Sequence, residues 1–136
     1  MLNVRWKRGA AVPGSGQVLI AATEAGVARY RDLPGAALAA MRLRRSWPTL
    51  DGAVALSLAV QPLQKRTRSI SVWQSEAHLL GFLRSASHLA TVRRYRGRVR
   101  VRSVTWTAAQ FDRLQARAEA ERRLNRGSVG PVRQRS

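Results

Sequence analysis

The sequence predicts an α+β fold, and three observations carry this prediction. Residues 53–60 and 68–73 alternate between two kinds of side chain with a period of two, which is typical of half-buried strands. Residues 32–47 and 76–97 are rich in helix-forming residues with apolar positions at helical spacing. With a short strand before and after, the order is strand, helix, strand, strand, helix, strand, and then a terminal helix. This is the split βαβ, or ferredoxin-like, arrangement with an antiparallel sheet.

The composition indicates one globular domain. The chain has 136 residues, of which 45% are hydrophobic and 24% charged. We place the domain at residues 17–125, between an irregular basic arm at 1–16 and a disordered basic tail at 126–136. No apolar run approaches the roughly 20 residues needed to cross a bilayer, so we expect a soluble, cytoplasmic protein with no membrane partner.

The domain begins with the short strand QVLIAA at residues 17–22. The helix of residues 32–47 follows, and it tolerates Pro34 because this proline lies in its first turn. Arginines crowd the C-terminal end of the helix, where positive charge complements the helix dipole. Pro48 then stops the helix.

The next two strands are expected to pair as a hairpin. In residues 53–60 the aliphatic side chains Val54, Leu56, Leu58 and Val60 share one parity and small residues share the other. Residues 68–73 divide in the same way. Pairing would build one sheet surface of alanine and serine with Trp73 standing over it. Ser75 is placed to cap the following helix, and Ser87 to cap its continuation.

The run RRYRGRVRVRS, residues 93–103, precedes a last strand, VTWT, and a terminal helix at 108–124. Its arginines alternate with a period of two, so an extended chain would present them as a comb on one face. The comb consists of Arg94, Arg96, Arg98, Arg100 and Arg102. The apolar parity changes near Ser103, which predicts a β-bulge or a strand that joins the sheet only after the run. Edge-strand protection, phosphate binding, and contact with an anionic ligand or a partner all stay open.

The charge balance is strongly basic, with 25 Lys and Arg against 7 Asp and Glu and a formal net charge of +18. Such a field attracts polyanions, although arginine beside so much alanine is also what a GC-rich coding sequence produces. The absence of cysteine excludes disulfides, thiolate metal sites and cysteine nucleophiles. Asp32, Asp51 and Glu76 stand at helix or turn starts, so we expect neither a hydrolytic carboxylate pair nor a metal site.

Two residues in the second half of the domain are candidates for chemistry. His88 is placed to act as a general base near neutral pH, and the indole of Trp73 could lie over an aromatic substrate. Packing roles stay open for both. His88, Val92 and Tyr95 fall on one side of their helix, at intervals of four and three. His78 lies early in its helix and is expected to be exposed.

The stretch RSISVWQSEAHLLGFLRSASHLATVRRYRG resembles the core of the dimeric α/β-barrel superfamily, which includes antibiotic-biosynthesis monooxygenase-like proteins and small haem-degrading monooxygenases. The shared pattern comprises a strand ending in Trp73, a polar helix start at Gln74-Ser75, Phe82-Leu83 inside the helix, and a His88 segment leading to the last strand. WPTLDGAVALSL is similar to the Pro-x-x-x-Gly turn that enters the second strand in that group. The likeness covers roughly residues 17–107.

The resemblance implies a dimeric α/β barrel, in which a homodimer forms through the open sheet face and the reaction pocket lies between sheet and helices. It implies a cofactor-independent oxygenase of an aromatic or polyketide-like small molecule, or a catalytically silent relative. Such a protein needs no cofactor, only an apolar pocket with a few polar groups. The catalytic positions are then His88 and Trp73. The substrate-binding positions are Ser71, Phe82, Val92 and Tyr95.

Particular residues disfavour two related functions. In the haem-degrading branch a helix tryptophan and a haem-ligating histidine would fall on Phe82 and Val92, so neither residue matches. RNA-binding sheets of this shape stack bases on aromatics of their first and third strands, but here the first holds none and the third only Trp73. The alternative function is therefore nonspecific polyanion binding, with the Arg94–Arg102 comb on nucleic acid.

Overall fold

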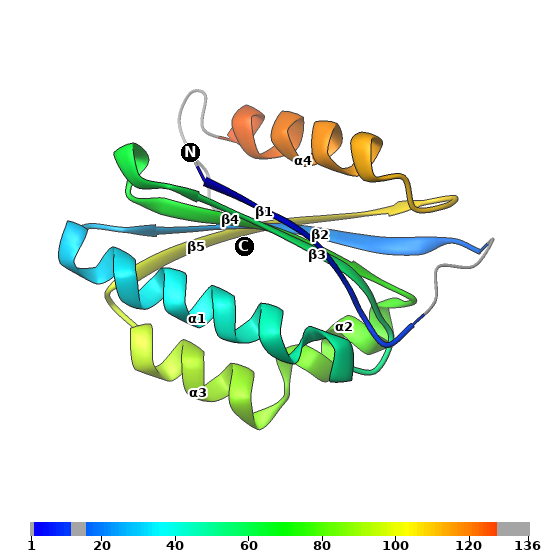
Figure 1. The fold of residues 1–136 in the computed structure, drawn as a ribbon, viewed down its shortest axis with the longest axis horizontal. Coiled ribbons are helices and arrows are strands. Elements are labelled where there is room, and N and C mark those ends of the chain that lie inside the picture. The colour runs from blue at the N-terminus through cyan, green and yellow to red at the C-terminus, as the bar shows by residue number, and fades with distance from the viewer. Residues whose placement is uncertain (1, 12–15, 128–136) are drawn as a thin grey trace.

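The computed structural model describes residues 2–11 and 16–127, which form a five-stranded antiparallel sheet with helices on both faces (Figure 1). Three helices cover one face, which we name the three-helix face, and the last helix covers the other, the α4 face. The strands are β1 (Leu2–Arg8), β2 (Val18–Val27), β3 (Ala53–Gln61), β4 (Arg66–Trp73) and β5 (Val99–Ala108). The helices are α1 (Leu33–Ser46), α2 (Glu76–Leu83), α3 (Ala86–Tyr95) and α4 (Arg113–Gly127). Short 3-10 turns are η1 (Tyr30–Asp32), η2 (Trp47–Thr49) and η3 (Pro62–Gln64).

The α+β ferredoxin-like fold is confirmed, and from β2 onward the elements follow the predicted order, with the second predicted helix divided into α2 and α3. The strands lie in the order β1-β3-β4-β2-β5, and neighbouring strands are antiparallel. β5 is an edge strand, as predicted. In the part of the chain that the structure describes, no helix is long and apolar enough to cross a membrane.

The predicted irregular arm is wrong for residues 2–8, which form β1 beside β3. The sequence LNVRWK alternates apolar and polar residues, and this period-two pattern is the strand signal that the arm interpretation overlooked. Gly9 continues the pairing by donating its N–H to the carbonyl of Val54 at 3.0 Å. A side chain at Gly9 would collide with the Ala53 backbone, so the close approach needs glycine. Of the predicted tail, 126 and 127 end α4 and the rest lies outside the described residues.

Serine caps divide the predicted second helix into α2 and α3. The Ser75 hydroxyl accepts a hydrogen bond from the backbone N–H of His78, as predicted. The cap of α3 is Ser85 instead of the predicted Ser87, because the Ser85 hydroxyl accepts from the backbone N–H of His88 at 3.3 Å. The break turns α3 back across the three-helix face beside α1 (Figure 1).

A bulge in β3 changes which residues share a face. The register shifts between Ala53 and Ala55, so Val54 and Ala55 both join the core under α4. Leu56 and Leu58 lie in the core of the three-helix face. The prediction that Val54 shares a face with these leucines is therefore wrong.

The hairpin of β3 and β4 forms, but its predicted surface of alanine and serine does not. Leu56 pairs with Ser71, and Ser57 pairs with Ile70. Large and small side chains thus alternate across the hairpin on both faces. This mixing lets helices approach both sides of the sheet closely.

β5 pairs with β2 in unbroken register from Val99 to Ala108. The bulge or late joining predicted near Ser103 is therefore wrong. The apolar parity changes because Val104 packs in the core under α4, whereas Arg102 lies where α4 ends and donates to the Leu124 carbonyl.

The predicted arginine comb is not a single strand. Arg94 belongs to α3 and Arg96 is its C-terminal cap, while Arg98 precedes the strand. Only Arg100 and Arg102 of the five stand on β5. The period of two in the sequence therefore crosses a helix end, a turn and a strand start.

Candidate functional site

An aromatic row crosses the three-helix face, and it consists of Trp47, Trp73, Phe82 and His88. The ring centroids of the two tryptophans lie 4.9 Å apart, in an edge-to-face arrangement. Those of Trp73 and Phe82 lie 5.5 Å apart. Those of Phe82 and His88 lie 4.8 Å apart. Four different elements, η2, β4, α2 and α3, bring these rings together.

Trp73 forms the interior of the row. Its side chain is buried between Trp47 and Phe82, and the residue is 1% exposed. Its indole N–H donates to the Ser71 hydroxyl at 3.0 Å, and that hydroxyl donates in turn to the Ala21 carbonyl at 3.4 Å. A ligand could reach the Trp73 ring only by displacing a neighbour, so the geometry suits Trp73 to positioning Phe82.

His88 forms the outer end of the row. Its ring makes a tilted contact with the ring of Phe82, and within the described residues neither ring nitrogen has a hydrogen-bond or ion-pair partner. The side chain is half-buried, and burial lowers its pKa below the ordinary value of 6.5. The neutral imidazole, which accepts a proton, is therefore the favoured form at neutral pH.

His78, the other histidine, is engaged in local structure. Its Nδ1 lies 2.8 Å from the Ser75 hydroxyl, and its Nε2 lies 3.8 Å from a carboxylate oxygen of Asp51. Gly52 has a positive φ of 77°, and any side chain there would collide with the His78 ring. The side chain is half-buried, so the prediction that His78 is exposed is wrong. These contacts tie the Pro-x-x-x-Gly turn to the start of α2.

The other two predicted substrate-binding residues lie further along α3. Val92 is one turn beyond His88 on the same side and is 45% exposed. Tyr95 stands near the C-terminal end of α3, where its hydroxyl would lie 2.9 Å from a side chain added at Gly35 of α1. The structure therefore groups Ser71, Trp73, Phe82 and His88, extends the group to Val92, and places Tyr95 against α1.

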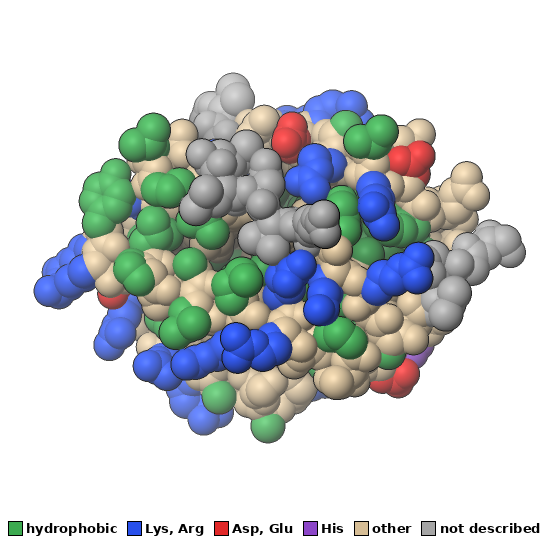
Figure 2. Space-filling model, in the orientation of Figure 1, with side chains coloured by type: hydrophobic (Ala, Val, Ile, Leu, Met, Phe, Trp, Pro, Cys, Tyr) green, Lys and Arg blue, Asp and Glu red, His purple; other side chains and the backbone are tan. Residues whose placement is uncertain are grey.

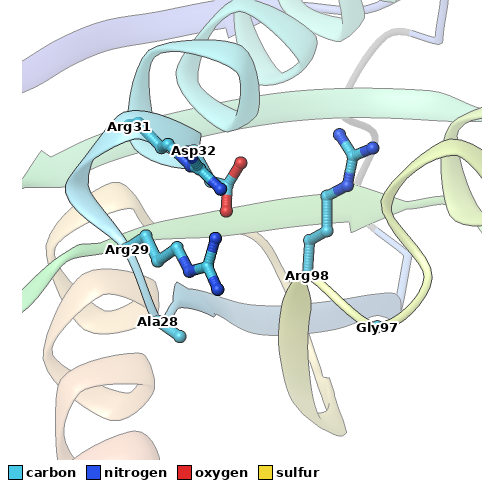
Figure 3. A pocket seen from close by; sticks show the side chains of 6 residues that line it. All are labelled: Ala28, Arg29, Arg31, Asp32, Gly97 and Arg98. Carbon is cyan, nitrogen blue, oxygen red and sulfur yellow. The ribbon is translucent and has the colours of Figure 1, made fainter.

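A separate hollow of about 560 Å³ lies at one end of the three-helix layer. Its lining residues are Ala28, Arg29, Arg31, Asp32, Gly97 and Arg98 (Figure 3). We name it the arginine hollow. No residue of the aromatic row lines it. The period-two pattern predicted Arg98 as part of the comb and gave no role to Arg29 and Arg31. Their only local signal is the pair of arginines in ARYRD, immediately before α1.

On the face that Figure 2 shows, the basic side chains do not form a single stripe. Figure 2 shows Lys and Arg side chains spread over the visible face, with few acidic side chains between them. Within the described residues, no three His, Asp or Glu side chains are grouped so that they could hold a metal ion.

No family model and no curated protein sequence matches this chain. Solved structures do match it. A proposed antibiotic biosynthesis monooxygenase from Nitrosomonas europaea has 9% identity and a TM-score of 0.61, over 68% of this chain and 91% of that one. SnoaB, a cofactor-independent oxygenase from Streptomyces nogalater, has 14% identity and a TM-score of 0.56, over 71% and 97%. A Bacteroides thetaiotaomicron protein described as a possible oxidoreductase has 12% identity and a TM-score of 0.59, over 70% and 100%.

These likenesses bear on the fold, because one fold hosts several chemistries and activity depends on the residues of the site. They confirm the resemblance at that level. The chain has the α+β ferredoxin-like fold of antibiotic-biosynthesis monooxygenase-like proteins.

Proposed function

We propose that the chain is a cofactor-independent oxygenase of an electron-rich aromatic or polyketide-like small molecule, with His88 as its general base. The observation that carries this proposal is the imidazole at the outer end of the aromatic row, whose ring nitrogens have no partner within the described residues. The fold shared with a cofactor-independent oxygenase also supports it.

The surroundings of His88 suit a planar apolar substrate. Phe82 supplies an aromatic wall at 4.8 Å between ring centroids, and the exposed Val92 extends the apolar surface by one helical turn. Trp73 acts on this surface as a positioning residue, because it holds Phe82 from behind. Burial lowers the His88 pKa and so raises the fraction of neutral base at pH 7.

The reaction needs a substrate whose own ring system stabilises a carbanion. His88 takes a proton from an activated CH₂ group beside the aromatic rings. The carbanion gives its electrons to dioxygen, a C–O bond forms, and His88 returns the proton to the resulting peroxide. The hydroperoxide then loses water, so CH₂ and O₂ become C=O and H₂O. Dioxygen is the oxidant, and no other electron carrier enters the balance.

The test is oxygen uptake with a panel of phenolic compounds that carry an activated ring CH₂, without added metal, flavin or haem. We expect uptake, and by mass spectrometry a product in which CH₂ has become C=O. His88→Gln should lower kcat by about 100-fold or more, because it removes the base. His78→Gln is the matched control, and it should retain kcat within about threefold because His78 lies outside the row.

Two results would overturn the assignment. Equal turnover by wild type and His88→Gln would remove His88 from the reaction. Binding of the compounds without oxygen uptake, seen as shifts of the Phe82 and His88 ring resonances, would identify a catalytically silent relative that keeps the binding surface.

The alternative function is nonspecific polyanion binding. The net charge of +18 still supports it, but the five arginines of the comb do not lie on one strand. A titration of fluorescent nucleic acid across a salt series tests it. Binding tighter than about 10 μM that persists near physiological salt would favour this function. Loss of binding well below that salt concentration would contradict this function.

A further inference from the structure

The arginine hollow forms where two distant segments leave the same end of the sheet. Val27 at the end of β2 pairs with Val99 at the start of β5. The residues just beyond this pair, Ala28 and Arg98, are therefore neighbours and line the hollow together. Figure 3 shows Arg29, Arg31 and Asp32 on one side of the hollow and Arg98 on the other.

Both walls of the hollow are held by backbone contacts. On the β2 side, the Lys65 ammonium donates to the Ala28 carbonyl at 3.3 Å and lies 5.1 Å from the centre of the Tyr30 ring. On the β5 side, the Arg98 N–H donates to the Tyr95 carbonyl at 2.9 Å, across a turn in which Gly97 has a φ of 83°. The guanidinium groups therefore extend from a pre-formed frame.

The charge inside the hollow is unbalanced. Three arginines stand against Asp32, and within the described residues no ion pair or side-chain hydrogen bond engages any of these four side chains. Five arginines elsewhere in the described residues do have an acidic partner: Arg66, Arg68 and Arg102 share Glu24, and Arg122 and Arg123 share Glu119.

We propose that the arginine hollow is a binding site for a small, multiply charged oxyanion, a phosphate or a polycarboxylate. Guanidinium forks donate two parallel hydrogen bonds to such groups, and a volume of about 560 Å³ accommodates a small molecule. Asp32 opposes excess negative charge and accepts a hydrogen bond from a ligand hydroxyl. The site shares no residue with the aromatic row, so this proposal does not depend on the proposed oxygenase function.

The experiment titrates the full chain with inorganic phosphate, pyrophosphate and citrate at constant ionic strength and follows binding by calorimetry. The phosphates and citrate are separate arms that distinguish the two sources of oxyanion. Arg98→Gln should weaken binding by about tenfold or more, because it removes one fork. Asp32→Asn should tighten binding severalfold, because it removes the opposing charge.

Arg96→Gln is the matched control. It makes the same change in net charge two residues away, on an exposed side chain that does not line the hollow. It should leave the affinity within about twofold. Thermal unfolding of each variant confirms that the fold is kept.

Three results would overturn the site. If Arg96→Gln and Arg98→Gln lowered the affinity for the anions equally, the binding would depend on the net charge of the protein and not on the hollow. Failure of all three anions to bind would remove the site. Binding of an oligonucleotide with no binding of the small anions would identify a diffuse polyanion surface in its place.

Discussion

The two faces of the sheet are built in opposite ways. On the α4 face, one helix lies on aliphatic strands through a stripe of small and buried residues, Ala116, Ala120 and Leu124. On the three-helix face, tryptophans fill the interior and apolar side chains of the helices remain exposed. These exposed residues are Leu38, Met41, Leu80, Leu83, Leu89 and Val92. One face is closely packed, and the other keeps exposed apolar side chains beside the half-buried His88.

The two faces also differ in the space left beside their helices. Alanines at helical spacing let the α4 backbone come close to the sheet, which leaves little room between them. A hollow of about 40 Å³ is found along this seam, whereas the hollow beside α1 and α3 measures about 560 Å³. The larger hollow lies at the end of the three-helix layer, where η1 meets the turn before β5, and it is the arginine hollow, not part of the aromatic row.

An ionic cluster completes the α4 face where α4 ends. Glu24 lies 2.8 Å from Arg68, 3.5 Å from Arg66 and 3.6 Å from Arg102. Arg68 also donates to Asn125, and Arg102 donates to the Leu124 carbonyl, so the cluster ties the helix end to three strands. Burial and the neighbouring charge of Arg68 lower the pKa of Arg66.

The homodimer implied by the resemblance stays a prediction. The implied interface was the open sheet face, and in this chain α4 covers that face (Figure 1). A homodimer would need another surface, or an α4 that leaves the sheet. Light scattering on the wild-type protein gives the oligomeric state directly.

Trp73→Ala should have the largest effect on stability, because this buried ring joins the sheet to Trp47 of η2 and Phe82 of α2. We expect the free energy of unfolding to fall by about 3–5 kcal/mol in urea titrations. Trp106→Ala is the control on the α4 face: that ring is half-buried at the edge strand, with Arg123 4.8 Å from its centre. A smaller loss from Trp73→Ala than from Trp106→Ala would contradict the central place of the row.

Leu124→Ala tests the seal on the other face. Leu124 is 1% exposed against the sheet, so we expect a loss of about 2–4 kcal/mol in the free energy of unfolding. Leu114→Ala in the same helix is the matched control, because Leu114 is 80% exposed and its loss should stay within about 0.5 kcal/mol. If α4 unfolded in a separate early transition, the two faces would not form one cooperative unit.

Glu24→Gln should lower the free energy of unfolding by about 1–3 kcal/mol, because it leaves three partly buried guanidinium groups without their shared carboxylate. Glu119→Gln is the comparison, since Glu119 pairs with more exposed arginines along α4 and should cost less than about 1 kcal/mol. Urea titrations at low and high salt measure both. Equal losses of unfolding free energy from the two variants would mean that burial does not strengthen the ion pairs of Glu24.

Local patterns in the sequence predicted the fold, and contacts between distant segments explain where prediction failed. The alternation in residues 68–73 and the Ser75 cap of α2 depend on neighbours along the chain, and both appear in the structure. The bulge at Val54 depends on the pairing of β3 with β4, which no single strand reveals. The arginine comb failed because period-two spacing reads as a strand even where α3 ends within it.

For the candidate site too, local patterns predicted some features, and contacts between distant segments determine the others. Helical spacing placed His88 and Val92 on one side, and the pattern ending in Trp73 placed that ring at a strand end. The stacking of Phe82 between Trp73 and His88 joins two helices that a turn separates. The arginine hollow joins residues 28–32 to 97–98 through the pairing of β2 with β5, and no local pattern carries that information.

The smallest expected effect comes from the protonation of His88 on the three-helix face. It should lower the free energy of unfolding in acid. Burial lowers its pKa below 6.5, so the folded chain binds this proton less readily than the unfolded chain. Its contribution to stability is therefore complete above about pH 6.5 and is lost as the pH falls from there toward the folded pKa. His88→Gln should remove this part of the pH dependence, measured as the difference in unfolding free energy between about pH 7.5 and pH 5. An NMR titration, with His78→Gln to assign the two ring resonances, gives the folded pKa, and a midpoint above 6.5 would contradict the buried, neutral imidazole on which the proposed base depends.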